Sequence, residues 1–260
     1  MNSSSGVGAL IIGDEITRGK RQDKHFAKIV DILAARGMAL DWALYLGDDR
    51  QRLTDTLRRS LASSDLVFSF GGIGNTPDDH TRQSAAAALD VKLVLHPEAE
   101  REIRARFVAL NREVTEDSLG MGRFPAGSHI IPNPFNRIPG FSVGDHHFVP
   151  GFPQMAWPMV EWVLDTRYAD RFNRQPSAED SILVWEGIES VLTPLMRRIE
   201  NEYPGVKVFS LPFLGSETLH RHIELGVRGV PVQVPGAMAA IQQEVSALGY
   251  RFDDPTAIRG

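Results

Sequence analysis

The residues with the clearest chemical potential follow a short apolar run at 65–70. A glycine-rich loop with three glycines comes next at 71–74, and an alanine-rich stretch at 81–89 has helical character. This order predicts a strand, a glycine loop and a helix. Glycines let a backbone approach a ligand closely, and the first N–H groups of a helix have no intrahelical partner. The stretch is therefore a candidate anion-binding loop.

The segment between the glycines and the helix carries two carboxylates, Asp78 and Asp79, and no lysine or arginine. Two carboxylates beside a phosphate repel it unless a divalent cation lies between them. A phosphate ligand is therefore expected to bind together with Mg²⁺, Mn²⁺ or Co²⁺. In the alternative, purely structural interpretation, Asp78 or Asp79 only caps the following helix.

Two earlier apolar runs, at 7–12 and 41–46, also end in glycine and carboxylate. The residues that follow them are Gly13, Asp14 and Glu15 in the first case, and Gly47, Asp48 and Asp49 in the second. In an open parallel sheet the carboxyl ends of the strands lie along one edge, where ligands bind. A single Gly-Asp turn is usually only turn chemistry. Three such loops on one edge favour a metal-assisted phosphate site.

The elements that must position these loops alternate along the chain. Apolar residues recur at helical spacing at 24–36 and 53–61, between the three expected strands. The pattern predicts an α/β fold with a mostly parallel sheet. From 120 to 153 glycine and proline recur, which is typical of a pocket wall or a loop-rich sheet edge. Within this region His146 and His147 are adjacent on an expected strand, so they point to opposite faces and are not expected to bind one metal.

A polar stretch at 170–180 is the best candidate for a linker. It divides the chain into a first domain at 1–172 and a second at 173–260. The second domain is expected to be a small α+β unit of β-α-β-β-α order, without a comparable cluster of chemistry. Its predicted strands are 182–185, 206–211 and 219–227, and its predicted helices are 189–202 and 235–248.

The composition excludes several classes of function. The 260 residues are 42% hydrophobic and 23% charged with a net charge of −5, so a nucleic-acid partner is not expected. There is no cysteine, which excludes disulfides, thiolate metal sites and cysteine nucleophiles. No apolar run approaches the roughly 18 residues of a membrane span, so a cytoplasmic location without a membrane partner is expected.

The glycine loop gives the chain a resemblance to a known family. Residues 71–81 match the Gly-Gly-x-Gly loop and Asp-Asp-x-Thr motif of the molybdopterin-binding, or molybdenum-cofactor-biosynthesis, domain family, and within it the N-terminal portion of CinA-type competence/damage-inducible proteins. Supporting matches are Gly13-Asp14-Glu15, Gly47-Asp48-Asp49, Asn133-Pro134, Pro139-Gly140-Phe141 and Pro150-Gly151-x-Pro153. The resemblance covers residues 7 to 165. It implies a three-layer α/β/α fold.

The resemblance also implies a function for this site. It implies binding of a pterin or nucleotide diphosphate with a divalent metal, with Asp48 and Asp79 as the catalytic carboxylates. The resemblance to CinA-type domains implies hydrolysis of a nucleotide pyrophosphate such as ADP-ribose. The alternatives are a molybdopterin-binding protein or molybdopterin adenylyltransferase, and a non-catalytic pterin- or nucleotide-binding module. The family further implies a homo-oligomer, a dimer or trimer. Because no C-terminal deamidase domain follows, that activity of full-length CinA is expected to be absent.

The expected site is specified by residue. The N–H groups of 72–75 are expected to hold phosphate oxygens, which removes the need for a lysine. The metal is assigned to Asp48, Asp78 and Asp79. The ligand-binding residues are Gly13, Asp14, Glu15, Gly71, Gly72, Ile73, Gly74, Asn75, Thr76, Thr81, Asn133, Pro134, Gly151 and Pro153. Departures from the family pattern near the ligand wall are His25, Asn136, Arg137 and Met155.

Overall fold

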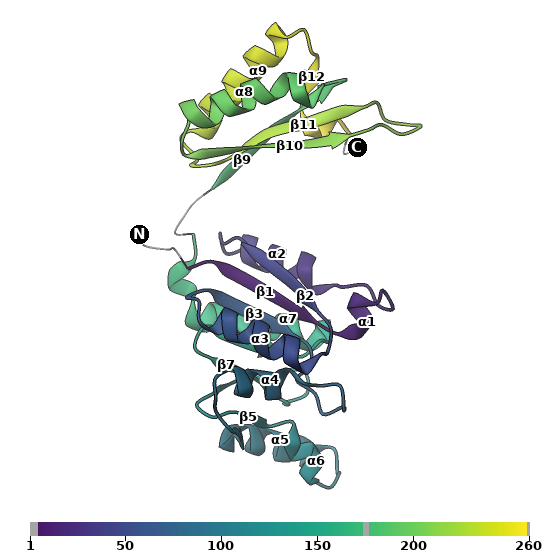
Figure 1. Cartoon of the computed structure of the whole chain (residues 1–260), viewed down its shortest axis with the longest axis vertical. Coiled ribbons are helices and arrows are strands. Elements are labelled where there is room, and N and C mark those ends of the chain that lie inside the picture. Colours follow the sequence, from purple (N-terminus) through teal and green to yellow (C-terminus); the bar gives the residue numbers. More distant parts are fainter. Residues whose placement is uncertain (1–4, 174–176, 259–260) are drawn as a thin grey trace. The chain divides into compact units, whose positions relative to one another are not determined.

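The chain forms two compact units. The computed structural model describes residues 5–173 and 177–258, and the units are Met1–Phe172 and Asn173–Gly260. Each unit has its own sheet and helices (Figure 1). No helix in the described stretches has the length and hydropathy of a membrane span.

Unit 1 is built on a six-stranded sheet of order β2-β1-β3-β8-β7-β6. The first four strands in this order run parallel, and β7 is antiparallel to both of its neighbours. The α/β fold with a mostly parallel sheet is thus confirmed. The strands are β1 (Val7–Ile12), β2 (Trp42–Leu46), β3 (Leu66–Phe70), β6 (His129–Ile131), β7 (Gly140–Val143) and β8 (His146–Val149).

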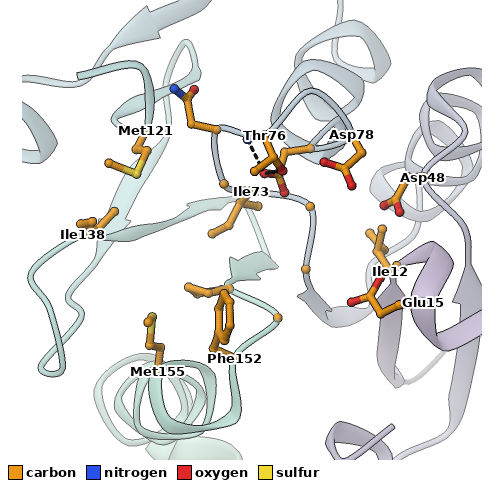
Figure 2. A pocket seen from close by; sticks show the side chains of 18 of the residues that line it. Ile12, Glu15, Asp48, Ile73, Thr76, Asp78, Met121, Ile138, Phe152 and Met155 are labelled. Carbon is orange, nitrogen blue, oxygen red and sulfur yellow. Dashed lines mark hydrogen bonds between the residues drawn. The ribbon is translucent and has the colours of Figure 1, made fainter. Parts of the chain in front are cut away.

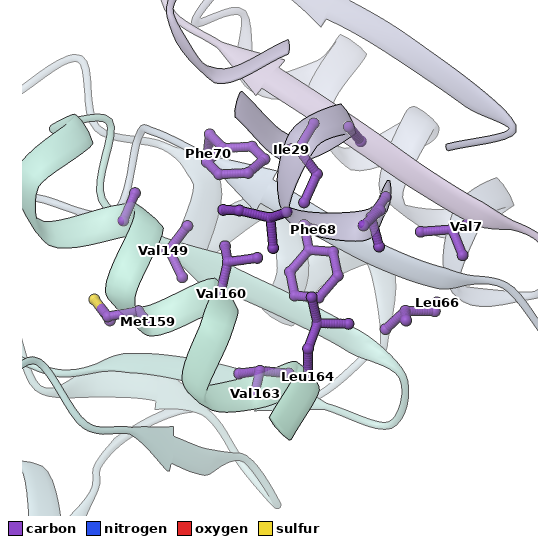
Figure 3. Packing of buried hydrophobic residues seen from close by; sticks show 14 of the residues in the cluster. Val7, Ile29, Leu66, Phe68, Phe70, Val149, Met159, Val160, Val163 and Leu164 are labelled. Atoms are coloured by element: carbon purple, nitrogen blue, oxygen red, sulfur yellow. The ribbon is translucent and has the colours of Figure 1, made fainter. Parts of the chain in front are cut away.

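Helices cover both faces of this sheet and bury alternate residues of each central strand. In β1, Val7, Ala9 and Ile11 pack in one apolar cluster with residues of α2 and α7. The intervening Leu10 and Ile12 pack in a second cluster with residues of α3 and α4. This period of two is expected of a strand buried on both faces. Figure 3 shows the first cluster, in which Val160 and Leu164 of α7 lie against Phe68 of β3. The helices are α1 (Asp14–Thr17), α2 (His25–Ala34), α3 (Arg50–Leu61), α4 (Thr81–Ala88) and α7 (Pro153–Arg167), with a 3₁₀ turn at Ala169–Arg171.

A small lobe follows α4 in the chain. Its two strands, β4 (Leu93–Leu95) and β5 (Arg123–Pro125), pair with each other antiparallel and form a separate sheet. Between them lie α5 (Pro97–Ala109) and α6 (Glu116–Gly120). The α6 helix begins with a reciprocal capping box between Thr115 and Ser118. The lobe places residues near 120 beside the glycine loop.

Unit 2 is an antiparallel sheet of order β10-β11-β9-β12 with α8 and α9 packed on one face. Strand β9 begins at Ala178, inside the stretch predicted as a linker, so the linker prediction was too long; residues 174–176 of it lie outside the described residues. The two-residue β12 was not predicted. The elements are β9 (Ala178–Trp185), α8 (Glu189–Glu202), β10 (Val206–Phe213), β11 (His222–Gly229), α9 (Val234–Ala247), β12 (Phe252–Asp253) and a 3₁₀ turn at Pro255–Ile258.

The outer edge of β10 is occupied by the chain's own groups. The Val206 N–H donates to the Tyr203 carbonyl oxygen at 3.0 Å, and the Val208 N–H donates to Glu200 Oε1 at 3.1 Å. Pro212, farther along the same edge, has no N–H to donate. Most of the outward donors of this strand are therefore satisfied or missing.

Candidate functional site

The acidic loops after β1 and β2 meet at the carboxyl edge of the sheet. The Asp14 N–H donates to Asp48 Oδ2 at 2.8 Å, and the Asp48 N–H donates to Asp14 Oδ1 at 3.3 Å. The loop after β3 joins them, because a Cβ on Gly71 would lie 2.3 Å from the Ile12 carbonyl oxygen. The expected convergence of the three loops on one edge is confirmed.

A cavity of about 370 Å³ opens between these loops (Figure 2). Most of the predicted site residues line it, namely Gly13, Glu15, Asp48, Gly71, Gly72, Ile73, Gly74, Asn75, Thr76, Asp78, Asp79, Asn133 and Gly151. Four predicted residues do not, namely Asp14, Thr81, Pro134 and Pro153. Asp14 holds the loop after β2, Thr81 lies behind the glycine loop, Pro134 lines a neighbouring groove, and Pro153 begins α7.

The glycine loop exposes a row of backbone donors. Gly71 and Gly72 have φ of +100° and +68°, the left-handed region that glycine adopts without strain. No described residue accepts a hydrogen bond from the N–H of residues 72, 73, 74 or 75, all of which line the cavity. Successive N–H groups in such a conformation form an anion-binding concavity. The geometry therefore suits the phosphate role predicted for this loop.

Asp79 closes the loop instead of capping the helix. Its Oδ2 accepts from the Thr76 N–H at 2.8 Å and from Thr76 Oγ1 at 2.5 Å. The N-cap of α4 is His80, without a side-chain capping bond, so the capping interpretation of Asp78 and Asp79 is wrong. Behind the loop, buried Thr81 donates from Oγ1 to the Gly71 carbonyl oxygen at 3.0 Å. Both contacts fix the loop in the shape that leaves its N–H groups free.

Carboxylates form one wall of the cavity. Burial raises the pKa of Asp48, and the charges of Asp14, Glu15 and Asp78 raise it further against a backbone hydrogen bond that lowers it. In Figure 2, Asp48 and Glu15 lie on one side of the cavity and Asp78 projects toward the same side. This concentration of negative charge makes the wall a favourable position for a cation.

The predicted metal set is only partly assembled. Among residues 5–173 and 177–258, no three His, Asp or Glu side chains are grouped so as to hold a metal ion. Asp79 Oδ2 accepts from Thr76 and Asp48 Oδ2 accepts from the Asp14 N–H, yet Asp48 and Asp78 both line the cavity, as does Asp79. Mg²⁺ is commonly bound by one or two carboxylates together with ligand phosphates and water. Two carboxylates beside a phosphate loop fit that mode, and the metal remains a prediction.

The opposite wall is apolar and was not predicted in full. It is formed by Met121, Ile138, Phe152 and Met155, which lie across the cavity from Asp48 and Glu15 in Figure 2. Two of the departures from the family pattern contribute here. Asn136 Oδ1 accepts from the Ile138 N–H at 2.9 Å, and its Nδ2 lies 3.5 Å from Met155 Sδ. The third, Arg137, lines the neighbouring groove instead.

The fourth departure, His25, supports the cavity from outside. Its ring stacks on Phe70 with centroids 4.6 Å apart, and its Nε2 lies 3.2 Å from the Gly151 carbonyl oxygen. Burial lowers the pKa of His25. The neutral ring with its proton on Nε2 donates to Gly151, a cavity residue. His25 thereby holds the start of α7 against β3.

Sequence reasoning missed two arginines of the site. Arg21 lines the cavity directly. Arg82, one residue after Thr81, is 3% exposed and bonds to the carbonyl oxygens of Gly74 and Gly120. Its spacing was the available signal, because residues three and four positions later, Ala85 and Ala86, place it on the buried face of α4.

Comparison with known proteins identifies the family. The sequence profile of the family described as "Probable molybdopterin binding domain" matches residues 8–169. The chain belongs to this family. In the chain's molybdopterin-binding domain, the matched residues include all three acidic loops and the whole cavity lining. The resemblance to CinA-type proteins is confirmed as well.

Individual relatives extend the comparison. A CinA-like protein of Anaeromyxobacter sp. (strain Fw109-5) is 33% identical over 242 residues, which cover 86% of this chain and 59% of the relative. A protein of Metallosphaera sedula is 28% identical over 250 residues and covered to 92% in both chains. The crystal structure of CinA from Thermoplasma acidophilum, described as of unknown function, is 25% identical with a TM-score of 0.56, over 62% of this chain and 97% of that one.

The chain covers only part of the length of these CinA-like relatives, which limits what they imply about it. The chain spans about half the length of the CinA-like proteins it matches, from 33% to 59%. The relatives therefore place the molybdopterin-binding domain in its family and do not assign the activities of the longer proteins to this chain.

Proposed function

We propose that the cavity of unit 1 binds a phosphorylated pterin of the molybdopterin class. One observation carries the proposal: four N–H groups that have no acceptor among the described residues line the same cavity as an apolar wall of Met121, Ile138, Phe152 and Met155. Phosphate is bound well by such backbone donors. The family of the domain supports a pterin as the group that accompanies it.

The two ends of the cavity match the two ends of this ligand. A pterin is a flat ring whose faces are apolar, and thioethers and aromatic rings pack well against such faces. Met121, Met155 and Phe152 supply those groups. The phosphate would lie at residues 72–75, and a divalent ion held by Asp48 and Asp78 would neutralise it. The cavity of about 370 Å³ falls within the usual range for small-molecule sites.

Calorimetry with matched ligands tests the proposal. The wild type is titrated with 6-hydroxymethylpterin diphosphate and with 6-hydroxymethylpterin, each with and without Mg²⁺. We expect both to bind, with the diphosphate binding more tightly and gaining most from Mg²⁺. Phe152→Ala removes an aromatic ring that is 55% exposed at the cavity, so it should weaken both ligands with little effect on folding. Failure of either pterin to bind the wild type would refute the proposal.

A second candidate function is hydrolysis of a nucleotide pyrophosphate such as ADP-ribose, or adenylyl transfer to the pterin. The observation that favours it is the crowding of carboxylates at Asp48, beside donors suited to phosphate. A divalent metal bound there would supply an activated water and neutralise charge on the phosphates. The chain's own N–H groups at 72–75 would hold the phosphate oxygens in place.

Product formation separates the two candidates. Phosphate release and nucleotide products are measured with ADP-ribose, FAD and ATP, the last with and without pterin, in Mg²⁺, Mn²⁺ or Co²⁺. Turnover should disappear in Asp48→Asn. Asp79→Asn separates catalysis from loop closure, because an amide oxygen still accepts from Thr76. Turnover retained in Asp79→Asn would overturn the predicted catalytic role of Asp79, and pterin binding without any turnover would leave a binding module.

A further inference from the structure

Arg82 is a buried cation directly behind the phosphate loop. It is 3% exposed, and its guanidinium bonds to the carbonyl oxygens of Gly74 and Gly120. Longer contacts reach the Arg123 carbonyl oxygen at 3.5 Å and Asn75 Oδ1 at 3.4 Å. A desolvated cation is costly unless it is hydrogen-bonded, so these oxygens hold it in place. Arginine is almost never this buried unless it is paired.

The contact with Gly74 orients a donor of the loop. In a trans peptide the C=O of one residue and the N–H of the next point in opposite directions. Because Arg82 holds the Gly74 carbonyl oxygen, the Asn75 N–H points away from Arg82. Asn75 lines the cavity, and no described residue accepts from its N–H. Arg82 therefore helps to keep this donor available.

The charge of Arg82 also offsets the carboxylates around the loop. Asp48, Asp78 and Asp79 line the cavity, while the segment from 71 to 80 contains no lysine or arginine. Burial lowers the pKa of Arg82 and the charge of Asp79 raises it, so the two side chains interact. Arginine keeps its charge in proteins. In a poorly solvated environment that charge acts strongly on a nearby anion.

We infer that Arg82 is a buried cation of the phosphate site, a positioning residue that acts through the backbone of the glycine loop without touching the ligand. The inference rests on the proposed function for phosphate binding at residues 72–75. Together with Arg21, which lines the cavity, it explains how a loop surrounded by three carboxylates and devoid of its own basic residue still accepts phosphate. It adds to the divalent ion and does not replace it.

Two substitutions separate charge from structure. Arg82→Lys keeps the charge, and Arg82→Gln keeps a hydrogen-bond donor without the charge. Each is titrated with inorganic pyrophosphate in Mg²⁺ and with uncharged 6-hydroxymethylpterin. We expect Arg82→Gln to lose pyrophosphate affinity roughly 10- to 100-fold and Arg82→Lys to lose clearly less. The pterin should bind all three proteins equally, because Asn75 Nδ2 still anchors the lobe through the Asp117 carbonyl oxygen at 2.8 Å.

Arg104→Gln is the matched control. Arg104 lies on α5, pairs with Glu100 at 2.6 Å and does not line the cavity, so the control removes the same charge elsewhere in unit 1. Equal pyrophosphate affinity of the Lys and Gln variants would overturn the inference, as would equal losses for pyrophosphate and pterin. If Arg82→Gln does not fold, Arg82→Lys must still bind pyrophosphate within about tenfold of wild type; a greater loss overturns the inference. A wild type that binds pyrophosphate but not pterin refutes the proposed pterin function and leaves the pyrophosphate comparison decisive for Arg82.

Discussion

Replacing Gly72 by alanine should destabilise the phosphate loop for two separable reasons. The residue has φ of +68°, so an alanine there costs about 1–2 kcal/mol for the left-handed backbone alone. Its Cβ would lie 2.2 Å from Thr81 Oγ1, so the buried hydroxyl has to move. That movement breaks the bond from Thr81 to the Gly71 carbonyl oxygen, which costs about 1 kcal/mol more. We expect Gly72→Ala to lower the free energy of unfolding by about 2–3 kcal/mol.

Comparison with Gly127→Ala isolates the second cause, the collision with Thr81. Gly127 has φ of +86°, yet a Cβ there meets nothing within 4 Å, and the residue does not line the cavity. It carries the backbone cost without the collision. Urea unfolding of both variants should therefore differ by about 1 kcal/mol, and only Gly72→Ala should lose pyrophosphate binding. Equal stabilities together with intact pyrophosphate binding in Gly72→Ala would refute the account of the loop.

Three further predictions concern titration and folding. Burial lowers the pKa of His146 from 6.5 to about 4, so between these pH values the unfolded chain binds a proton that the folded chain does not. Stability therefore falls as the pH is lowered through this range. His146→Gln should reduce this fall by about 1.4 kcal/mol per pH unit in urea unfolding at pH 6 and 5; an unchanged slope contradicts the assignment. The raised pKa of Asp48 means that its ionisation destabilises the folded state as pH rises, so Asp48→Asn should raise the melting temperature at pH 8 and lose this advantage toward pH 4; an equal shift at both values counts against it. Residues 173–260 expressed alone should melt cooperatively by circular dichroism, since their apolar core is drawn from unit 2 itself; a broad, featureless melt would disprove independent folding.

The carboxyl edge of the sheet was predictable because it follows from topology. Parallel strands must end on one side, so glycine and carboxylate after β1, β2 and β3 were bound to meet. The adjacent histidines were equally constrained by the period of a strand. His146 Nε2 lies 2.6 Å from Ser60 Oγ, whereas His147 Nδ1 lies 2.8 Å from Ser142 Oγ. They contact different partners, as predicted.

The rest of the site depends on contacts that leave no local pattern. Met121 and Ile138 reach the cavity through a lobe and a loop whose packing is set by tertiary structure. Arg82 is buried although arginine is mostly exposed, and only its spacing on α4 indicated the buried face; its partners Gly74 and Gly120 did not follow from that spacing. At the polar start of β9, pairing of Ala178 with Gly229 of β11 overrides weak strand propensity. Such contacts are decided between distant segments and cannot be read from neighbouring residues.

The occupied edge of β10 has a consequence for how this protein meets other chains. An open strand edge is a template on which a foreign strand, or the same strand of another copy, can add and start aggregation. In unit 2, Tyr203 and Glu200 already accept from β10, and Pro212 offers no donor. Extension of this sheet by a strand added at β10 is thus disfavoured. A partner that approaches unit 2 at the β10 edge therefore has to be recognised through side chains and not by strand addition.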